Sequence, residues 1–127
     1  MLHLIRGLPG SGKTIFAKTL DCFHIEADMF FVQNGVYTFN PKRIADAHKW
    51  CQSVVCTALS NGMDVAVSNT FTTLWELEPY LEMTHTYDLK VYTCMGRWNS
   101  VHSIPIDVWQ KMEARWESFE GETFINR

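Results

Sequence analysis

Residues 7–14 of the chain, Gly-Leu-Pro-Gly-Ser-Gly-Lys-Thr, match the phosphate-loop pattern GxxxxGK(S/T). Glycine at positions 7, 10 and 12 lets the backbone curl its amide groups around an anion. Lys13 would neutralise phosphate oxygens as a point charge, and the Thr14 hydroxyl would bind a Mg²⁺ ion that bridges them. The segment therefore predicts a site for ATP, or another NTP, with Mg²⁺, made by Gly7, Leu8, Pro9, Gly10, Ser11, Gly12, Lys13 and Thr14.

The residues on either side of this loop have the pattern that such a site needs. An apolar run at 2–5 precedes it, and apolar residues follow at helical spacing from Ile15 to Leu20. The order strand, loop, helix directs the free amides of the helix N-terminus toward a bound phosphate. An ordinary glycine turn, the structural alternative, does not account for the pair Lys13-Thr14.

A carboxylate that could act on a phosphate acceptor follows the second apolar run, at 23–25. Asp28 is expected at the carboxyl end of a parallel strand, on the same sheet edge as the phosphate loop. There it could accept the proton of an attacking hydroxyl and orient that hydroxyl for in-line transfer. We favour Asp28 over Glu26 for this role, and the structural alternative is a cap or a solvated surface acid.

Strand and helix signals alternate along the rest of the chain. Asn34-Gly35 predicts a tight type I′ hairpin that lies outside the main sheet. Asn40-Pro41 predicts the start of a long helix, which Asn61-Gly62 ends. The remaining expected elements are strands at 65–67 and 89–94, a helix within 72–86 that Pro79 delays or divides, a loop at 95–104, a last helix opening at Pro105, and a possible strand at 123–125.

This alternation predicts an α/β fold of the P-loop NTPase class. Right-handed crossovers would give three α/β/α layers around a parallel sheet of four to five strands. A length of 127 residues predicts a single domain over 1–127. In the last helix, one stripe is expected to pack as a seam against the core: Trp109, Met112, Trp116 and Phe119.

The composition limits the classes of function. Hydrophobic residues make up 46% of the chain, which excludes disorder, and the net charge is −3, so any contact with nucleic acid must be local. Cys22, Cys51, Cys56 and Cys94 lack zinc-site spacing and are expected to be reduced core thiols. No apolar run approaches the ~20 residues that cross a bilayer. A cytoplasmic protein without a membrane partner is expected.

Five stretches together resemble polynucleotide kinase-like P-loop kinases, including the AAA ATP-binding family related to NEDD4-binding protein 2. They are Arg6–Thr14, Asp28–Phe31 followed by Gly35–Asn40, Ala47–Trp50, Ser68–Thr70, and Ile104–Val108 with Met112 and Arg115. The resemblance implies transfer of the ATP γ-phosphate to a 5′-hydroxyl. It also implies that Asp28 is the general base, and that a lid arginine, here Arg97, stabilises the transferring phosphoryl group.

The chain departs from the pattern of this family at the turn after the third strand. The family usually has an acid there, whereas this chain has Ser68, Asn69 and Thr70, which carry no carboxylate. A hydroxyl and an amide can hydrogen-bond a substrate or metal-bound water, but they add no charge beside Mg²⁺. Weaker metal fixation or reduced activity is therefore expected.

The segment 95–105 resembles the lid of the family, with a second departure. Arg97, Asn99 and His102 are retained in type, but Trp98 intervenes and Ser103 stands where glycine is usual. An arginine aimed at the γ-phosphate can raise the rate by several orders of magnitude. His102 is expected to orient the lid backbone, and Trp98 either stacks on a base or packs the lid.

The leading hypothesis is Mg-ATP-dependent phosphoryl transfer to a hydroxyl of a nucleic-acid 5′ end or a nucleoside-like molecule. Lys13, Asp28 and Arg97 would carry the chemistry. One alternative is a nucleotide-binding regulatory protein with weak or no kinase activity, because the third-strand acid is missing. Another is a small-metabolite kinase, which the acidic balance of the chain favours mildly.

Overall fold

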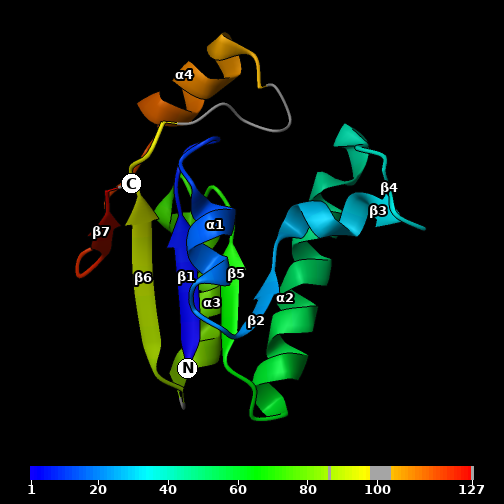
Figure 1. The fold of residues 1–127 in the computed structure, drawn as a ribbon, viewed down its shortest axis with the longest axis vertical. Helices are drawn as coiled ribbons and strands as arrows, with labels where there is room; N and C mark the ends of the chain where they lie inside the picture. The colour runs from blue at the N-terminus through cyan, green and yellow to red at the C-terminus, as the bar shows by residue number, and fades with distance from the viewer. Residues whose placement is uncertain (86, 98–103, 127) are drawn as a thin grey trace.

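A parallel sheet of five strands forms the centre of the protein in the computed structural model, which describes residues 1–85, 87–97 and 104–126 (Figure 1). The strands run in the order β2-β5-β1-β6-β7, and each neighbouring pair is parallel. Their bounds are β1 (Leu2–Arg6), β2 (Phe23–Ile25), β5 (Val65–Ser68), β6 (Leu89–Cys94) and β7 (Thr123–Ile125). The predicted α/β class is confirmed, and the C-terminal segment supplies the fifth strand.

Helices cover both faces of the sheet. Alternate strand residues point to opposite sides, so the apolar strands present side chains to be buried on both faces. Leu2 and Leu4 of β1 belong to a core that includes residues of α2 (Ile44–Ser60) and α3 (Leu74–Glu82). Ile5 packs on the other side with residues of α1 (Lys13–Lys18). These two cores make the three predicted layers, and they hold β1 in the middle of the sheet.

The polar turns form as their sequences predict. After the 3₁₀ helix η1 (Ala27–Phe31), strands β3 (Val32–Gln33) and β4 (Val36–Tyr37) pair in a separate antiparallel hairpin. Its turn residues have φ of 52° at Asn34 and 78° at Gly35, the positive pair that a type I′ turn requires. A 3₁₀ turn, η2 (Pro41–Arg43), then leads into α2. The Asn40 side chain caps this turn by accepting a hydrogen bond from the Lys42 backbone amide at 3.0 Å.

Helix α3 corrects one expectation. The helix begins at Leu74, where the Glu76 carboxylate accepts a hydrogen bond from the Thr73 amide at 2.9 Å, and it runs unbroken through Pro79. A 3₁₀ turn, η3 (Met83–His85), follows it. Pro79 removes only the hydrogen bond to the carbonyl four residues earlier, which belongs to Trp75. Trp75 is 76% exposed. The prediction that Pro79 delays or divides the helix is therefore wrong.

Helix α4 (Ile106–Ala114) corrects a second expectation, the core-facing stripe. None of its residues is buried, and Trp109 and Met112 are half-buried, so the stripe does not line a core seam. The helix also ends before Trp116 and Phe119, although Phe119 does pack against the core from beyond the helix. Both faces of the sheet are already covered by other helices, and α4 instead lies above the carboxyl edge of the sheet (Figure 1).

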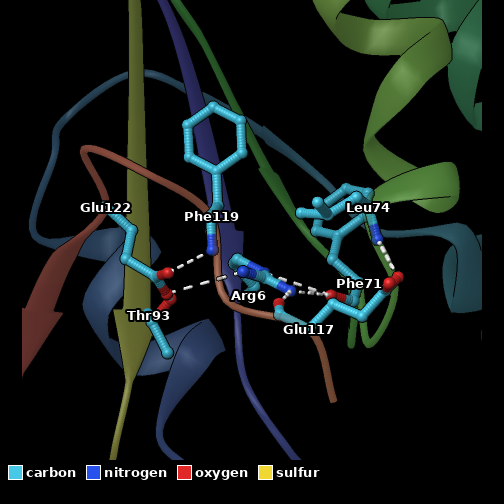
Figure 2. Close-up of polar contacts among 7 residues, drawn as sticks. All are labelled: Arg6, Phe71, Leu74, Thr93, Glu117, Phe119 and Glu122. Atoms are coloured by element: carbon cyan, nitrogen blue, oxygen red, sulfur yellow. Dashed lines mark hydrogen bonds and ion pairs between the residues drawn. The ribbon is translucent and has the colours of Figure 1, made fainter. Parts of the chain in front are cut away.

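A buried arginine joins the C-terminal segment to the sheet (Figure 2). Arg6 ends β1 and is 0% exposed; its Nε and Nη2 atoms donate hydrogen bonds to the Phe71 carbonyl at 3.1 and 2.7 Å. Nη2 also donates to the Glu117 carbonyl at 2.6 Å, and Nη1 lies 3.5 Å from Oε1 of Glu122. The guanidinium stacks over the Trp116 ring, 4.3 Å from its centroid. One cation thus holds three segments that are distant in the sequence.

Glu117 and Glu122 extend this network to the strands and helices around it (Figure 2). The Glu122 carboxylate accepts hydrogen bonds from the Thr93 hydroxyl and the Phe119 amide. The Glu117 carboxylate accepts a hydrogen bond from the Leu74 amide at 2.9 Å, at the start of α3. The segment before β7 is therefore fixed by side chains rather than by apolar packing alone.

The cysteines follow their prediction in part. None of these four described residues forms a disulfide, and Cys51 and Cys94 are buried. Cys56 is exposed on α2, so the expectation of a core position is wrong for this residue. Among the residues that the structure describes, no helix is both long enough and apolar enough to cross a membrane.

Replacing Arg6 with methionine should lower the free energy of unfolding by about 3–5 kcal/mol, because the change leaves Glu122 and two carbonyls buried without their partner. Urea denaturation at neutral pH measures this loss. Arg43→Met is the matched control, since the Arg43 side chain is 52% exposed and its ion pair with Asp46 should contribute no more than about 1 kcal/mol. Equal losses in the two variants would contradict the anchoring role of Arg6.

Candidate functional site

The phosphate loop has the backbone that its glycines predict. Gly10 and Gly12 have φ of 80° and 93°, in the left-handed region that favours glycine. Gly7 is required for a different reason, because a Cβ there would lie 2.2 Å from Oγ of Ser11 and 3.1 Å from the Cys94 carbonyl oxygen. The loop is therefore closely packed at Gly7, next to the anchored Arg6.

Contacts from three directions hold the loop in place. The Gly7 amide donates to the Thr70 carbonyl at 3.2 Å, which joins the loop to the turn after β5. Within the loop, the Leu8 carbonyl accepts hydrogen bonds from the Ser11 amide at 3.1 Å and from the Lys13 amine at 3.2 Å. Trp109 of α4 donates from Nε1 to the Pro9 carbonyl at 3.2 Å. These contacts fix the shape of the loop backbone.

The amine of Lys13 is buried in the phosphate loop, where a bound anion would stabilise its charged form. Desolvation within the loop lowers its pKa to about 8, although the negative charges of Glu26, Cys94 and Asp28 act in the opposite direction. The charged form is therefore poorly solvated in the free protein. A bound triphosphate would replace the missing solvation with direct charge neutralisation, which is the role expected of this lysine.

Thr14 and Glu26 form an oxygen-rich pair at the start of α1. The Thr14 hydroxyl donates to both carboxylate oxygens of Glu26, at 3.1 Å each. Hydroxyl and carboxylate oxygens are hard donors of the kind that Mg²⁺ prefers, and Mg²⁺ usually takes only one or two protein groups along with water and phosphate oxygens. The residues present therefore fit the magnesium ion that the family implies.

Asp28 is the second residue of η1, two residues after Glu26. It is exposed, and its Oδ1 accepts a hydrogen bond from the Tyr37 hydroxyl at 3.1 Å. Desolvation and the Asp28 charge raise the pKa of Tyr37 to about 12, so this phenol stays a donor at neutral pH. The hairpin therefore orients Asp28 at the same edge of the sheet as Lys13, whose pKa its charge affects.

The turn after β5 braces the site. The Ser68 hydroxyl lies 2.6 Å from Nε2 of His24, a histidine for which the sequence offers no partner. The Asn69 carbonyl oxygen accepts a hydrogen bond from the Ala27 amide at 3.0 Å, and the carbonyl of Thr70 accepts from the Gly7 amide. These three predicted residues connect the phosphate loop to the segment that carries Asp28.

Arg97 is connected to the phosphate loop through the ring of Trp109. Its side chain is 76% exposed, lies over the Trp109 ring at 5.0 Å from the centroid, and reaches the Glu113 carboxylate at 3.5 Å. Trp109 in turn contacts the loop at Pro9. The other predicted lid residues, Trp98, Asn99 and His102, lie outside the described residues.

Two residues of the site have a role that sequence reasoning missed. Glu26 contacts Thr14 although Asp28 was the favoured acid; its place directly after a strand was the available signal. Trp109 contacts the loop although its helical spacing predicted a core stripe. Spacing alone shows that Trp109 faces the protein, but it does not tell which part.

The comparison with protein families identifies the domain. The family model described as an AAA domain, AAA_33, matches residues 2–95, well over half of the chain. The chain belongs to this family. The matched region contains the phosphate loop, both acids and the turn after β5. Arg97 and α4 lie beyond the matched AAA_33 segment.

Individual proteins agree with this assignment. Human NEDD4-binding protein 2 is 34% identical over 97 residues, which are 72% of this chain; the chain spans 6% of the length of that protein. The structure of the Pnkp1/Rnl/Hen1 RNA repair complex matches 94% of this chain and 40% of the other, with a TM-score of 0.60 and 20% identity. Chaetomium thermophilum Kti12 in complex with ADP-AlF₃ matches over 99% and 89%, with a TM-score of 0.64 and 13% identity. The resemblance predicted from the sequence is confirmed, and the AAA_33 domain has the fold of P-loop kinases.

ATP affinity should fall as the pH rises above about 8, the pKa of Lys13 in the free protein. A bound triphosphate raises this pKa, so binding between the two values takes up a proton, and the required proton becomes scarcer as pH increases. Calorimetry at pH above 8 in two buffers of different ionisation enthalpy measures the uptake. Lys13→Arg, which stays charged, should abolish it. Equal uptake in both proteins would show that another group titrates.

Proposed function

We propose that the domain is a cytoplasmic Mg-ATP-dependent kinase that transfers the γ-phosphoryl group to a hydroxyl. The observation that carries this proposal is the placement of Asp28. Two acids follow β2; Glu26 contacts Thr14 of the phosphate loop, and Asp28 is held beside it by Tyr37. A hydrolase needs only to activate water, whereas an exposed, oriented carboxylate beside the phosphates suits an incoming acceptor.

The residues divide the work by their chemistry. Lys13 and the loop amides neutralise the phosphate oxygens, and Thr14 would hold Mg²⁺, which supplies further charge neutralisation when bound. Asp28 accepts the proton of the acceptor hydroxyl as it attacks in line, and Tyr37 keeps Oδ1 oriented. The acceptor oxygen then forms its bond to phosphorus as the bond to the ADP oxygen breaks.

Arg97 is proposed to stabilise the transferring phosphoryl group. Besides the Trp109 ring, its guanidinium contacts the Glu113 carboxylate at 3.5 Å, and the two side chains are 76% and 49% exposed. Exposed ion pairs of this kind contribute roughly 0–1 kcal/mol, so Arg97 can exchange Glu113 for a phosphate at little cost. The resemblance supports Trp98, Asn99 and His102 as the rest of this lid.

A nucleic-acid 5′-hydroxyl, or a nucleoside-like molecule, is the proposed acceptor. Tyr37, whose hydroxyl touches Asp28, is 39% exposed, and Phe39 beyond it is 50% exposed. Aromatic rings in such positions provide surfaces on which bases can stack. The fold that the domain shares with a protein of the RNA repair complex supports the same class of acceptor.

Asp28→Asn should reduce phosphoryl transfer by about 10²- to 10⁴-fold, the usual contribution of a general base, while ATP affinity persists. The assay follows label from γ-labelled ATP with Mg²⁺ into 5′-hydroxyl oligonucleotides, nucleosides and small hydroxylated metabolites. Asp46→Asn, an exposed aspartate on α2, is the matched control and should keep the full rate.

The panel also separates the alternatives. Transfer only to small metabolites would identify a metabolite kinase, in agreement with the net charge of −3. Intact ATP binding without transfer to any acceptor would contradict the kinase and favour a nucleotide-binding regulator. Lys13→Ala should weaken ATP binding itself, and unchanged affinity would mean that the loop does not bind the phosphates.

A further inference from the structure

The turn after β5 has no acid, but the neighbouring strand end does. Strands β2 and β5 are adjacent and parallel, with Ile25 opposite Val67 as the last registered pair. The next residues are Glu26, directly after β2, and Ser68, the last residue of β5, so the two lie at the same edge of the sheet. A carboxylate therefore stands one strand away from the position where the sequence lacks one.

The side chains at this edge contact one another in a series. Both Glu26 oxygens accept from the Thr14 hydroxyl at 3.1 Å, and Oε2 lies 3.7 Å from Nε2 of His24. The same His24 nitrogen lies 2.6 Å from the Ser68 hydroxyl. Glu26 is half-buried, with 21% of its side chain exposed. The Ser68 hydroxyl therefore contacts the same ring nitrogen that faces the Glu26 carboxylate.

We propose that Glu26 supplies, from β2, the carboxylate that fixes Mg²⁺ at this site, in place of the acid missing at Ser68. This inference rests on the proposed Mg-ATP site. It assigns to Glu26 a role that the sequence pattern places on the third strand, and Ser68 and His24 are the neighbours of that carboxylate at the sheet edge.

The chemistry follows from the hydroxyl of Thr14. A hydroxyl has one proton to donate and two lone pairs. While Glu26 accepts the proton, a lone pair remains available for a cation, and its direction is set by the hydrogen bond. The carboxylate also adds a negative charge beside the cation, which neither Ser68 nor Asn69 can do. Glu26 is therefore a positioning residue for the metal.

Glu26→Gln tests the proposal through metal-linked binding rather than through activity. The measurement is the affinity for a non-hydrolysable ATP analogue with Mg²⁺ and with EDTA, by calorimetry at neutral pH. The gain that Mg²⁺ gives should fall by about 10- to 100-fold, the usual loss when a metal-orienting partner is removed. Affinity in EDTA should hold or rise, because a negative charge beside the triphosphate is gone.

The double variant E26Q/S68D is the decisive companion. It returns a carboxylate to the level of the same sheet edge on the neighbouring strand, and it should recover at least part of the Mg²⁺-dependent gain. Ser68→Asp alone places two carboxylates side by side and should not increase the gain. Glu78→Gln, an exposed glutamate on α3, is the matched control and should match the wild type.

The outcomes separate this inference from the proposed function. A full Mg²⁺-dependent gain in Glu26→Gln would overturn the role of Glu26 and leave the kinase proposal standing. A lost gain that Ser68→Asp cannot restore, with the fold intact by circular dichroism, would also contradict the replacement of one acid by the other. Absence of phosphoryl transfer in the wild type would overturn the kinase proposal alone, because the metal-linked affinities can still be compared.

Discussion

The buried guanidinium of Arg6 is the interaction on which the architecture around the site depends. A cation without solvent exposure is costly unless every donor is satisfied, and here carbonyls, a carboxylate and an aromatic face surround it. One of those carbonyls belongs to Phe71, a buried residue with φ of 47°, a left-handed conformation that is unfavourable for a side chain of this size. The hydrogen bonds from Arg6 help to hold that backbone. Because Gly7 follows directly, the anchor of β1 is also the base of the phosphate loop.

Two unfavourable features of the site, the buried amine of Lys13 and the neighbouring negative charges, would be relieved by a ligand. Burial lowers the pKa of Lys13, and a triphosphate would restore the solvation that the amine lacks. Glu26 and Asp28 place negative charge close to the same region, which would oppose bare phosphates but favour phosphates accompanied by a divalent cation. This charge pattern would favour a nucleotide that is accompanied by a divalent cation, in agreement with the proposed Mg-ATP site.

Local signals predicted the local structure, and long-range contacts account for what they missed. The phosphate loop, the Asn34-Gly35 turn and the C-terminal end of α2 depend on the conformations of a few adjacent residues, so their sequences were sufficient; Asn40-Pro41 begins a 3₁₀ turn, and α2 itself starts at Ile44. The partners of Arg6 come from segments more than sixty and more than a hundred positions away, and nothing near Arg6 in the sequence indicates them. The stripe through Trp109 shows the same limit. Helical spacing identified the apolar face of the helix but not its partner. Other helices cover both faces of the sheet, and this helix contacts the phosphate loop instead.

The pair formed by Glu26 and Ser68 shows why a missing motif residue is weak evidence for a missing function. A motif assigns each role to a position along one strand, whereas a cation responds to charge in space. In a parallel sheet, the carboxyl ends of neighbouring strands lie about 4.8 Å apart. A side chain as long as glutamate can span that distance, so an acid can move to the adjacent strand and still reach the same threonine. The sequence of the third strand, with Ser68 in place of an acid, predicts a weakened metal site. The pairing of the strands shows instead that a carboxylate is present at the end of the neighbouring strand, at Glu26, where it contacts Thr14.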